Sequence, residues 1–300
     1  MKRRNYLKYL GIGTGAVLLN PVKAAAKEES ATKKKRLMRV AHITDVHIRP
    51  EHDASNRFLK CLEEIKKHKV DFFLNGGDTI YAADYSNITR DRVNAQWEIW
   101  HKLRKEFSEF EVYSCLGNHD MWWATEESDV MYGKDYVVDN LDIPNNYYSL
   151  KKSGWTFIVL DSLYKRGIAL GDEQMAWLDD ELASLPTDSP VLIMTHCPIL
   201  NVSTIIDGGN HKDFEEITDL FYKHKDKKIN CISGHVHLLD KSNYNGVDYY
   251  SNGAMSGFWW EEGNERSGGK SWVRETPPGY AILDLYDDGT MDNTYYPHTY

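Results

Sequence analysis

The chain has 300 residues, of which 41% are hydrophobic and 12% aromatic, so it can bury a sizeable core and is neither disordered nor fibrous. Its net charge is −9, but residues 1–36 contain ten Lys and Arg and two Glu, which leaves 26 basic and 43 acidic residues, net −17, in the rest. A body that acidic repels polyanions and argues against long nucleic acid as a substrate, whereas a small phosphate ester is compatible with it if bound metal makes the local field positive.

Residues 1–26 have the layout of a secretory signal peptide: a basic start, a Gly-containing apolar stretch and the small-residue exit Ala24-Ala25-Ala26. The run from Arg3 to Lys8 resembles the twin-arginine export motif. We therefore expect the precursor to use the twin-arginine export machinery, which moves folded proteins, and the mature protein to be exported, periplasmic or otherwise extracytoplasmic. The alternative is a basic N-terminal helix that lies on a membrane.

Residues 27–36 are charged and offer nothing apolar to bury, so they are predicted to form a disordered linker before one domain at 37–300. No segment approaches the roughly 18 apolar residues that would span a bilayer, so the mature chain is expected to have no transmembrane segment. The oligomeric state is left open.

Apolar runs and helical stripes alternate along this domain. Strands are predicted at 37–44, 70–75, 110–116, 146–154, 155–162, 190–195, 229–233, 241–252 and 279–290, and helices at 56–68, 90–107, 172–185 and 214–224. Ser153-Gly154 and Asn245-Gly246 are expected hairpin turns. The order is βαβαβ followed by a mixed half with hairpins, which favours an α/β fold with layered sheets. Residues 257–278 are rich in Gly, Trp and charge and are interpreted as a long functional loop.

Five of the predicted strands are followed by oxygen or imidazole side chains. These residues are Asp45, His47, Asp78, Asn118, His119, Asp120, His196, His235 and His237. The carboxyl edge of an α/β sheet is where sites form, and Asp-x-His or His-x-His would place both groups on one side of an extended chain. Gly before Asp78, Asn118 and His235 is expected to let the chain turn sharply so that the ligands converge.

Two Asp, one Asn and four His are too many ligands for one tetrahedral metal and suit two metals that share a carboxylate. Because no thiolate takes part, Mn, Fe, Zn or a mixed-valence pair fits the site. Each motif alone has an ordinary structural explanation, such as a turn or a helix cap. The ordered set of five, each after a strand, favours a dinuclear centre.

These motifs resemble the five sequence blocks of the calcineurin-like metallophosphoesterases, and the resemblance covers about residues 37–290. The matching blocks are Asp45-Val46-His47, Gly77-Asp78, Gly117-Asn118-His119-Asp120, His196 and Gly234-His235-Val236-His237. The resemblance implies a four-layer α/β/β/α sandwich of two mixed β-sheets flanked by helices. It also implies that Asp45, His47, Asp78 and His237 hold one metal, that Asp78 bridges, and that Asn118, His196 and His235 hold the second.

The same resemblance implies hydrolysis of a small phosphodiester or phosphomonoester by a hydroxide that bridges the two metals. His119 is implied to be the general acid that protonates the leaving group, the alternative being a hydrogen bond to a phosphate oxygen. Asp120 is interpreted as a loop-capping residue. The loop after Asp78 lacks the Asp-Arg-Gly continuation of serine/threonine protein phosphatases. A phosphodiesterase is therefore a better interpretation than a protein phosphatase.

Two alternatives remain. The run from Gly77 to Tyr81 also resembles the Gly-Asp-x-x-Tyr block of purple acid phosphatases, in which the tyrosine binds ferric iron. We expect His47 to take the ligand position and Tyr81 to lie outside it. A non-catalytic metal-binding scaffold is the other alternative, but such scaffolds lose ligands or the acid histidine, and this chain has all of them.

Several residues beside these blocks are candidates for substrate contacts. Trp122, Trp123 and Trp259 could stack on a nucleobase or pack their loops together. Arg49 could clamp a phosphate, and Asn252 could donate a hydrogen bond to one. The four cysteines, Cys61, Cys115, Cys197 and Cys231, are interpreted as buried small hydrophobes, although export leaves a disulfide among the last three open.

Overall fold

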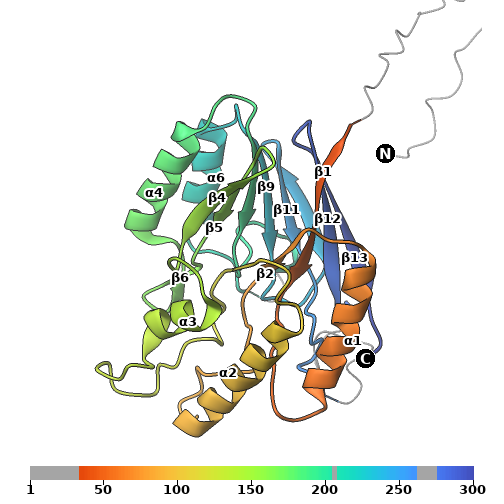
Figure 1. The fold of residues 1–300 in the computed structure, drawn as a ribbon. Helices are drawn as coiled ribbons and strands as arrows, with labels where there is room; N and C mark the ends of the chain where they lie inside the picture. Colours follow the sequence, from red (N-terminus) through yellow and green to blue (C-terminus); the bar gives the residue numbers. More distant parts are fainter. Residues whose placement is uncertain (1–33, 205–207, 262–275) are drawn as a thin grey trace, which may run out of the picture. The chain divides into compact units, whose positions relative to one another are not determined.

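The first sheet contains the three parallel strands of the predicted βαβαβ unit. The computed structural model describes residues 34–204, 208–261 and 276–300. In it β1 (Arg36–Ile43), β2 (Phe72–Asn75) and β3 (Val112–Ser114) run parallel, and β12 (Gly279–Tyr286) and β13 (Met291–Pro297) are added antiparallel beside β1. The strand order is β13-β12-β1-β2-β3 (Figure 1). The predicted signal peptide and most of the 257–278 loop lie outside the described residues.

The second sheet has a parallel centre between two hairpins, in the order β10-β11-β9-β8-β5-β4. Its strands are β4 (Tyr148–Lys152), β5 (Trp155–Val159), β8 (Pro190–Met194), β9 (Lys228–Ser233), β10 (Asp240–Tyr244) and β11 (Val247–Ser251). The two predicted turns are confirmed. Ser153-Gly154 has φ of 45° and 87° and Asn245-Gly246 has φ of 52° and 82°, the left-handed pairs that suit two-residue hairpins.

Four predicted helices are present as α1 (Ala54–Lys67), α2 (Arg90–Lys105), α4 (Gly171–Ser184) and α6 (Phe214–Lys223). The prediction missed α3 (Gly133–Leu141), the hairpin of β6 (Leu163–Tyr164) and β7 (Gly167–Ile168), and strand β13. The helix α3 begins at a glycine and has no side-chain cap, so its start carries no local signal. Strand β13 is an edge strand in which only one of seven residues is buried, so its apolar pattern is weak.

Adjacent residues of β2 show how the layers stack. The Phe72 ring lies 5.4 Å from that of Phe157 in the second sheet, whereas the Phe73 ring lies 5.2 Å from Phe107, just after α2. On the second sheet Leu192 belongs to the core between the sheets and Ile193 to a separate core under α4 and α6. The order is therefore helices, sheet, sheet, helices, and the predicted α/β/β/α sandwich is confirmed (Figure 1).

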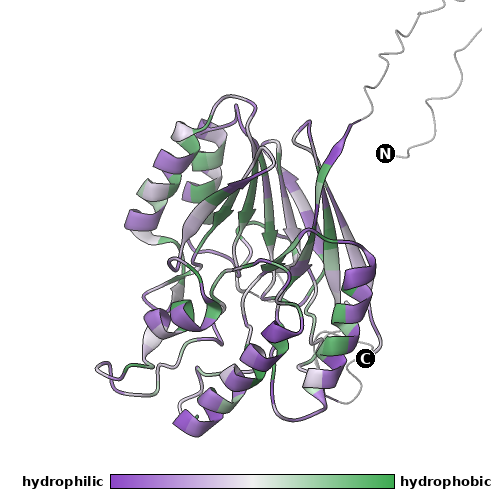
Figure 2. Ribbon diagram, in the orientation of Figure 1, coloured by the Kyte–Doolittle hydropathy of each residue, from purple (hydrophilic) through white to green (hydrophobic). Residues whose placement is uncertain are grey.

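Hydropathy follows the same layering. Figure 2 shows apolar strands in the interior and helices whose outward faces are hydrophilic. The α1 helix buries Phe58, Cys61, Leu62 and Ile65 on one side. No helix among the described residues is both long and apolar enough to cross a membrane.

Candidate metal centre and active site

The loops that carry the predicted ligands all follow the carboxyl ends of parallel strands. Asp45 and His47 follow β1, Asp78 follows β2, and His196 follows β8. The loops are tied together within each sheet, because the Asp45 amide donates to the Gly77 carbonyl and the Gly234 amide to the His196 carbonyl, both at 3.0 Å. A further hydrogen bond links loops of the two sheets: the His235 amide, after β9, donates to the Asp45 carboxylate, after β1, at 3.0 Å. The ligand loops of both sheets therefore lie together at the carboxyl edge of the parallel strands.

The first group of side chains consists of Asp45, His47 and His237, whose ligand atoms lie within 4.8 Å of one another. His237 Nε2 is 3.3 Å from Asp45 Oδ1 and 3.4 Å from His47 Nε2. Asp45 and His47 are fully buried. A carboxylate and two imidazoles that face one another at these distances form a site for a divalent cation.

Asp78 lies between this group and the second one. Its Oδ2 is 3.2 Å from His196 Nε2 and 3.7 Å from His47 Nε2. His196 Nε2 is also 3.1 Å from Asn118 Oδ1, and the His196 ring centroid is 5.0 Å from that of His235. The structure thus brings all seven predicted ligands together, with the Asp78 carboxylate in the position of a bridge.

Hydrogen bonds behind these groups orient them. The Nδ1 atoms of His196 and His47 lie 2.8 Å and 3.0 Å from the carbonyl oxygens of Gly76 and Tyr81. When Nδ1–H donates to each carbonyl, the lone pair of Nε2 is available to bind a metal. Asp78 Oδ1 accepts the His119 amide at 2.8 Å, which keeps Oδ2 for the centre.

Five of the seven candidate ligands have a left-handed rather than an extended backbone. The φ angles of Asp45, His47, Asp78, His235 and His237 are 51°, 43°, 50°, 68° and 55°. The expectation that Asp-x-His and His-x-His present their side chains by strand alternation is therefore wrong. Left-handed backbone instead turns these five side chains toward the centre, a conformation that costs about 1–3 kcal/mol per residue and clusters at functional sites.

The glycines of these loops allow neighbouring loops to approach closely more than they allow sharp turns. A Cβ on Gly117 would lie 1.9 Å from the Asp78 nitrogen, and one on Gly234 would lie 1.9 Å from Thr44 Oγ1. Neither glycine has a positive φ, whereas Gly77 has φ of 90°. The predicted sharp turn is thus confirmed only at Gly77, and at the other two positions glycine lets two loops touch.

The electrostatics of the centre suit cations. Burial alone would raise the pKa of Asp78, but the neighbouring His196, His119 and His47 lower it below its usual range. Burial lowers the pKa of His47 to about 3, so this imidazole is neutral at neutral pH and its lone pair is available. Two ionised carboxylates, an amide oxygen and imidazoles without thiolate form a donor set that fits two cations of the Mn, Fe or Zn type.

His119 lies beside this centre with a partner that the sequence analysis missed. Its Nδ1 is 2.7 Å from Asp84 Oδ1, and its side chain is 17% exposed. Burial lowers the pKa of His119, but the carboxylates of Asp78 and Asp84 outweigh that effect and raise it to about 9. No motif marked Asp84, and the only signal was an acidic residue in the loop after Asp78.

Asp120 is a loop cap, as predicted. It is fully buried, its Oδ1 accepts the amides of Thr79 and Ile80 at 2.8 Å and 3.2 Å, and its Oδ2 accepts the Gly117 amide at 2.9 Å. Burial first, and then the charge of Asp78, raises the pKa of Asp120 to about 7. This carboxylate therefore joins the loop that carries Asp78 to the loop that carries Asn118.

The candidate substrate residues separate into two sets. Trp122 is buried with the guanidinium of Arg90 5.3 Å from its ring, and the Trp123 ring lies 5.3 Å from that of Tyr132. These two tryptophans pack their loop together and against the start of α2. Trp259 instead lies against the centre, with its ring 5.2 Å from the His47 ring.

Tyr81 and Asn252 are engaged elsewhere. The Arg49 guanidinium stacks 3.9 Å from the Tyr81 ring, which also contacts Tyr85 and Trp259. Asn252 is fully buried, and its amide lies 2.8 Å from His42 Nδ1 and is also hydrogen-bonded to Asn293. The predicted phosphate contact of Asn252 is therefore not supported, because its side chain holds strands together behind the site.

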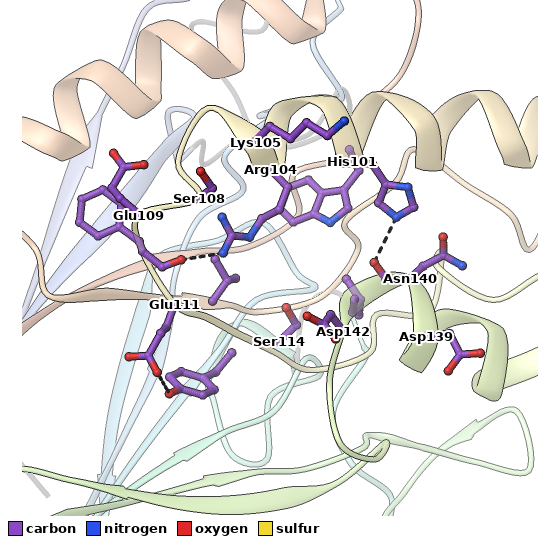
Figure 3. A pocket seen from close by; sticks show the side chains of 15 residues that line it. His101, Arg104, Lys105, Ser108, Glu109, Glu111, Ser114, Asp139, Asn140 and Asp142 are labelled. Carbon is purple, nitrogen blue, oxygen red and sulfur yellow. Dashed lines mark hydrogen bonds between the residues drawn. The ribbon is translucent and has the colours of Figure 1, made fainter.

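The cysteines and one surface pocket lie apart from this chemistry. All four cysteines are buried and free, as the packing interpretation predicts, so none forms a disulfide. A pocket of about 700 Å³ opens between α2, β3 and the end of α3 and is lined by residues such as His101, Arg104 and Asp142 (Figure 3). It contains none of the predicted ligands, and the Arg104 guanidinium in it already donates to the carbonyls of Phe107 and Phe110.

Comparison with known proteins identifies the family of this chain and several relatives. A family model described as calcineurin-like phosphoesterase matches residues 38–239. A 3′,5′-cyclic-nucleotide phosphodiesterase of Nostoc sp. is 25% identical over 265 residues, which cover 84% of this chain and 89% of the relative. A probable cyclic nucleotide phosphodiesterase of Psychrobacter sp. is 28% identical over 193 residues, 60% of this chain and 53% of the relative, so the match spans about half of that protein.

A dimetal phosphatase from Danio rerio shares the fold, with a TM-score of 0.60 at 15% identity over 84% of this chain and 94% of that one. The family match covers the strands and loops that carry all seven candidate ligands. The chain belongs to the calcineurin-like phosphoesterase family and is a hydrolase of phosphoric esters.

Proposed function

We propose that this phosphoesterase hydrolyses a small phosphodiester, and that a 3′,5′-cyclic nucleotide is the best-supported class. The observation that carries the proposal is the position of Asp78, whose Oδ2 lies within 3.7 Å of imidazoles from both groups of ligands. The substrate class is supported by the Nostoc and Psychrobacter relatives, which are named as cyclic nucleotide phosphodiesterases. The acidic body of the chain disfavours longer nucleic acids.

In this proposal Asp45, His47, Asp78 and His237 hold one cation, and Asp78 shares the second with three further ligands. Those further ligands are Asn118, His196 and His235. Two bound cations of this kind supply an activated water and draw charge from the phosphoryl oxygens. The protein's part is to hold the ligands rigidly, by the carbonyls behind the imidazoles and the amides behind the carboxylates.

His119 is proposed to protonate the leaving oxygen. Because its Nδ1 faces Asp84 at 2.7 Å, the opposite nitrogen, Nε2, is the one that can give a proton to substrate. Its ring is 5.3 Å from that of His47, so it borders the cation site without entering the ligand set. Asp84 orients the ring and keeps the proton on Nδ1.

The purple-acid-phosphatase alternative is less well supported. His47 Nε2 already faces Asp78 and His237, and the Tyr81 ring is packed under Arg49. The proposal therefore predicts a protein without a tyrosinate-to-iron charge-transfer band. A visible tyrosinate charge-transfer band in the active, metal-loaded protein would instead favour Tyr81 as an iron ligand.

The central test compares hydrolysis of bis-p-nitrophenyl phosphate and p-nitrophenyl phosphate, with metal analysis of the same sample. We expect about two metals per chain and faster turnover of the diester. Asp78→Asn should lose metal and activity together because it removes the shared ligand. An Asp78→Asn variant that keeps both metals and full activity contradicts the assignment, and a strong preference for the monoester contradicts the substrate class.

We also propose that residues 1–26 direct export, on the strength of their sequence pattern alone. The double substitution of Arg3→Lys and Arg4→Lys should leave the protein in the cytoplasm, because the export receptor reads the arginine pair. Fractionation of cells that produce each form measures this. Equal export of both forms would show that twin-arginine recognition plays no part.

A further inference from the structure

A strained turn next to the metal centre presents an aromatic ring to it. Trp259 and Trp260 have φ angles of 55° and 67°, a conformation that is an outlier for bulky residues. Two consecutive residues of this kind cost about 1–3 kcal/mol each and persist only where the surroundings impose them. Such strain is a reason to look for a function at the turn.

The anchor of the turn is Trp260. Its side chain is fully buried, its Nε1–H donates to the Val46 carbonyl at 2.8 Å, and its ring stacks on His298. Arg57 Nη1 also donates to the Trp260 carbonyl at 2.9 Å. Since Val46 lies between the candidate ligands Asp45 and His47, the Trp260–Val46 hydrogen bond fixes the turn directly to the metal loop, and the Arg57 bond fixes it to α1.

The residue that the anchor positions is Trp259. Its ring centroid lies 5.2 Å from His47, 5.7 Å from His119 and 5.4 Å from Tyr81, and Phe258 stacks beside it at 5.4 Å. The ring is only partly buried, yet its Nε1 atom is buried and has no hydrogen-bond partner among the described residues. An unpaired buried donor is uncommon and costs about 1–3 kcal/mol.

Arg49 carries a second unpaired donor in the same neighbourhood. The residue is 9% exposed, its Nε donates to Glu51 at 3.1 Å, and its guanidinium lies on the Tyr81 ring. Within the part of the chain that the structure describes, its Nη1 has no hydrogen-bond partner, and Glu261 Oε1 is 4.0 Å away, beyond hydrogen-bond distance. Glu261 belongs to the turn that presents Trp259, so the two donors flank the same part of the site.

We propose that Trp259 and Arg49 form a subsite for the nucleobase of a small nucleotide ester, a step that rests on the proposed function. The Trp259 ring contacts both His119, from which the leaving oxygen would take its proton, and His47, a candidate metal ligand. The alcohol portion of the ester therefore lies against the indole. A base supplies a ring that packs on an aromatic side chain, worth about 1–3 kcal/mol, and acceptor atoms for the two unpaired N–H groups. An aliphatic alcohol supplies neither.

The test compares a 3′,5′-cyclic nucleotide with glycerophosphoethanolamine, a diester whose alcohols are aliphatic. Trp259→Leu should raise KM for the nucleotide about 10- to 100-fold and change kcat by less than about threefold, while kcat/KM for the aliphatic diester stays within about threefold. Trp259→Phe keeps a ring but loses the N–H and should be intermediate. Arg49→Gln should also raise KM for the nucleotide alone. The matched control is Trp177→Leu, a half-buried tryptophan on α4.

A binding measurement gives a second readout that does not depend on turnover. Calorimetry on the metal-loaded protein measures the affinity for a nucleoside 5′-monophosphate and for inorganic phosphate. Trp259→Leu should weaken the first about 10- to 100-fold and leave the second unchanged, because phosphate alone reports on the cations. Equal losses for both ligands, or none for either, overturn the subsite.

The outcomes separate the two proposals. A metal-loaded wild-type protein that hydrolyses neither diester refutes the proposed function, and the subsite fails with it. A wild-type protein that hydrolyses diesters, combined with a Trp259→Leu variant that lowers kcat/KM equally for both of them, overturns the subsite alone. Circular dichroism of each variant excludes loss of the fold as the cause of any change.

Discussion

The close approach of the Gly117 loop to the Asp78 loop predicts the effect of one added methyl group. In Gly117→Ala the new Cβ would lie 1.9 Å from the Asp78 nitrogen and 2.2 Å from Asp78 Oδ1, whereas such contacts begin at about 3.0 Å. The nearest clashing atom is the backbone nitrogen of Asp78, and a backbone atom cannot relieve the clash by a change of rotamer. The loops must therefore separate by about 1 Å, at a cost of about 1–3 kcal/mol in the free energy of unfolding.

That displacement matters more for the site than for the fold. Metal–ligand distances tolerate only about 0.2 Å, so a shift of about 1 Å moves the shared carboxylate out of reach of one cation. A misplacement of that size in an active site can lower the rate about 10²-fold. We expect Gly117→Ala to retain at most one metal and to lose about 10²-fold in kcat/KM for the diester.

The assay is metal content per folded chain, measured with thermal unfolding and diester hydrolysis on the same preparation. The matched control is Gly167→Ala, where the added Cβ would lie 3.4 Å from its nearest neighbour and φ is not in the left-handed region. This control should keep its metals and its activity. A Gly117→Ala variant with two metals and wild-type turnover would refute the close-approach argument.

Three further predictions concern the residues around the centre. Asp84→Asn should lower kcat for a cyclic nucleotide about 10- to 100-fold and lower nitrophenyl ester turnover less, because a good leaving group does not need His119; equal losses on both esters, or loss of metal, would contradict the positioning role. Asp120→Ala should leave three buried amides unpaired and cost about 3–6 kcal/mol in the free energy of unfolding, which chemical denaturation measures. Burial lowers the pKa of His42 from 6.5 to about 4. Between these two pH values His42 is therefore mostly protonated in the unfolded chain and mostly neutral in the folded chain. The metal-free protein should therefore lose about 3 kcal/mol of stability between pH 6.5 and pH 4, and His42→Gln should remove that part of the slope in urea unfolding; identical slopes would contradict it.

Much of this fold follows from local patterns. The strands before Asp78 and His196 are almost continuous apolar runs, which is how strands covered on both faces appear in a sequence. The left-handed turn at Asn245-Gly246 follows from its two residues alone. Where patterns were weak, as in the exposed edge strand β13 and the uncapped α3, the prediction missed the element.

The site shows the same division. Polar residues that follow strand after strand identified the candidate metal ligands, because chain order alone shows which strands end in ligand-type side chains. The reason that they converge was different from the one predicted. The left-handed backbones of Asp45 and His47, and the contact of Gly117 with Asp78, arise only when two loops are forced together.

The sequence by itself determined the layered α/β class, the order of the strands that deliver ligands and the chemistry of the ligand set. Only the tertiary structure decided which aromatic rings face that chemistry. Trp122 and Trp123 are adjacent to His119 in the chain yet pack their own loop, whereas Trp259 reaches the centre from far along the chain. Asp84 likewise became the partner of His119 because the loop after β2 packs against the loop after β3. The physical reason is that hydrophobicity and backbone preference are local, whereas the pairing of side chains depends on which loops the packed sheets bring together.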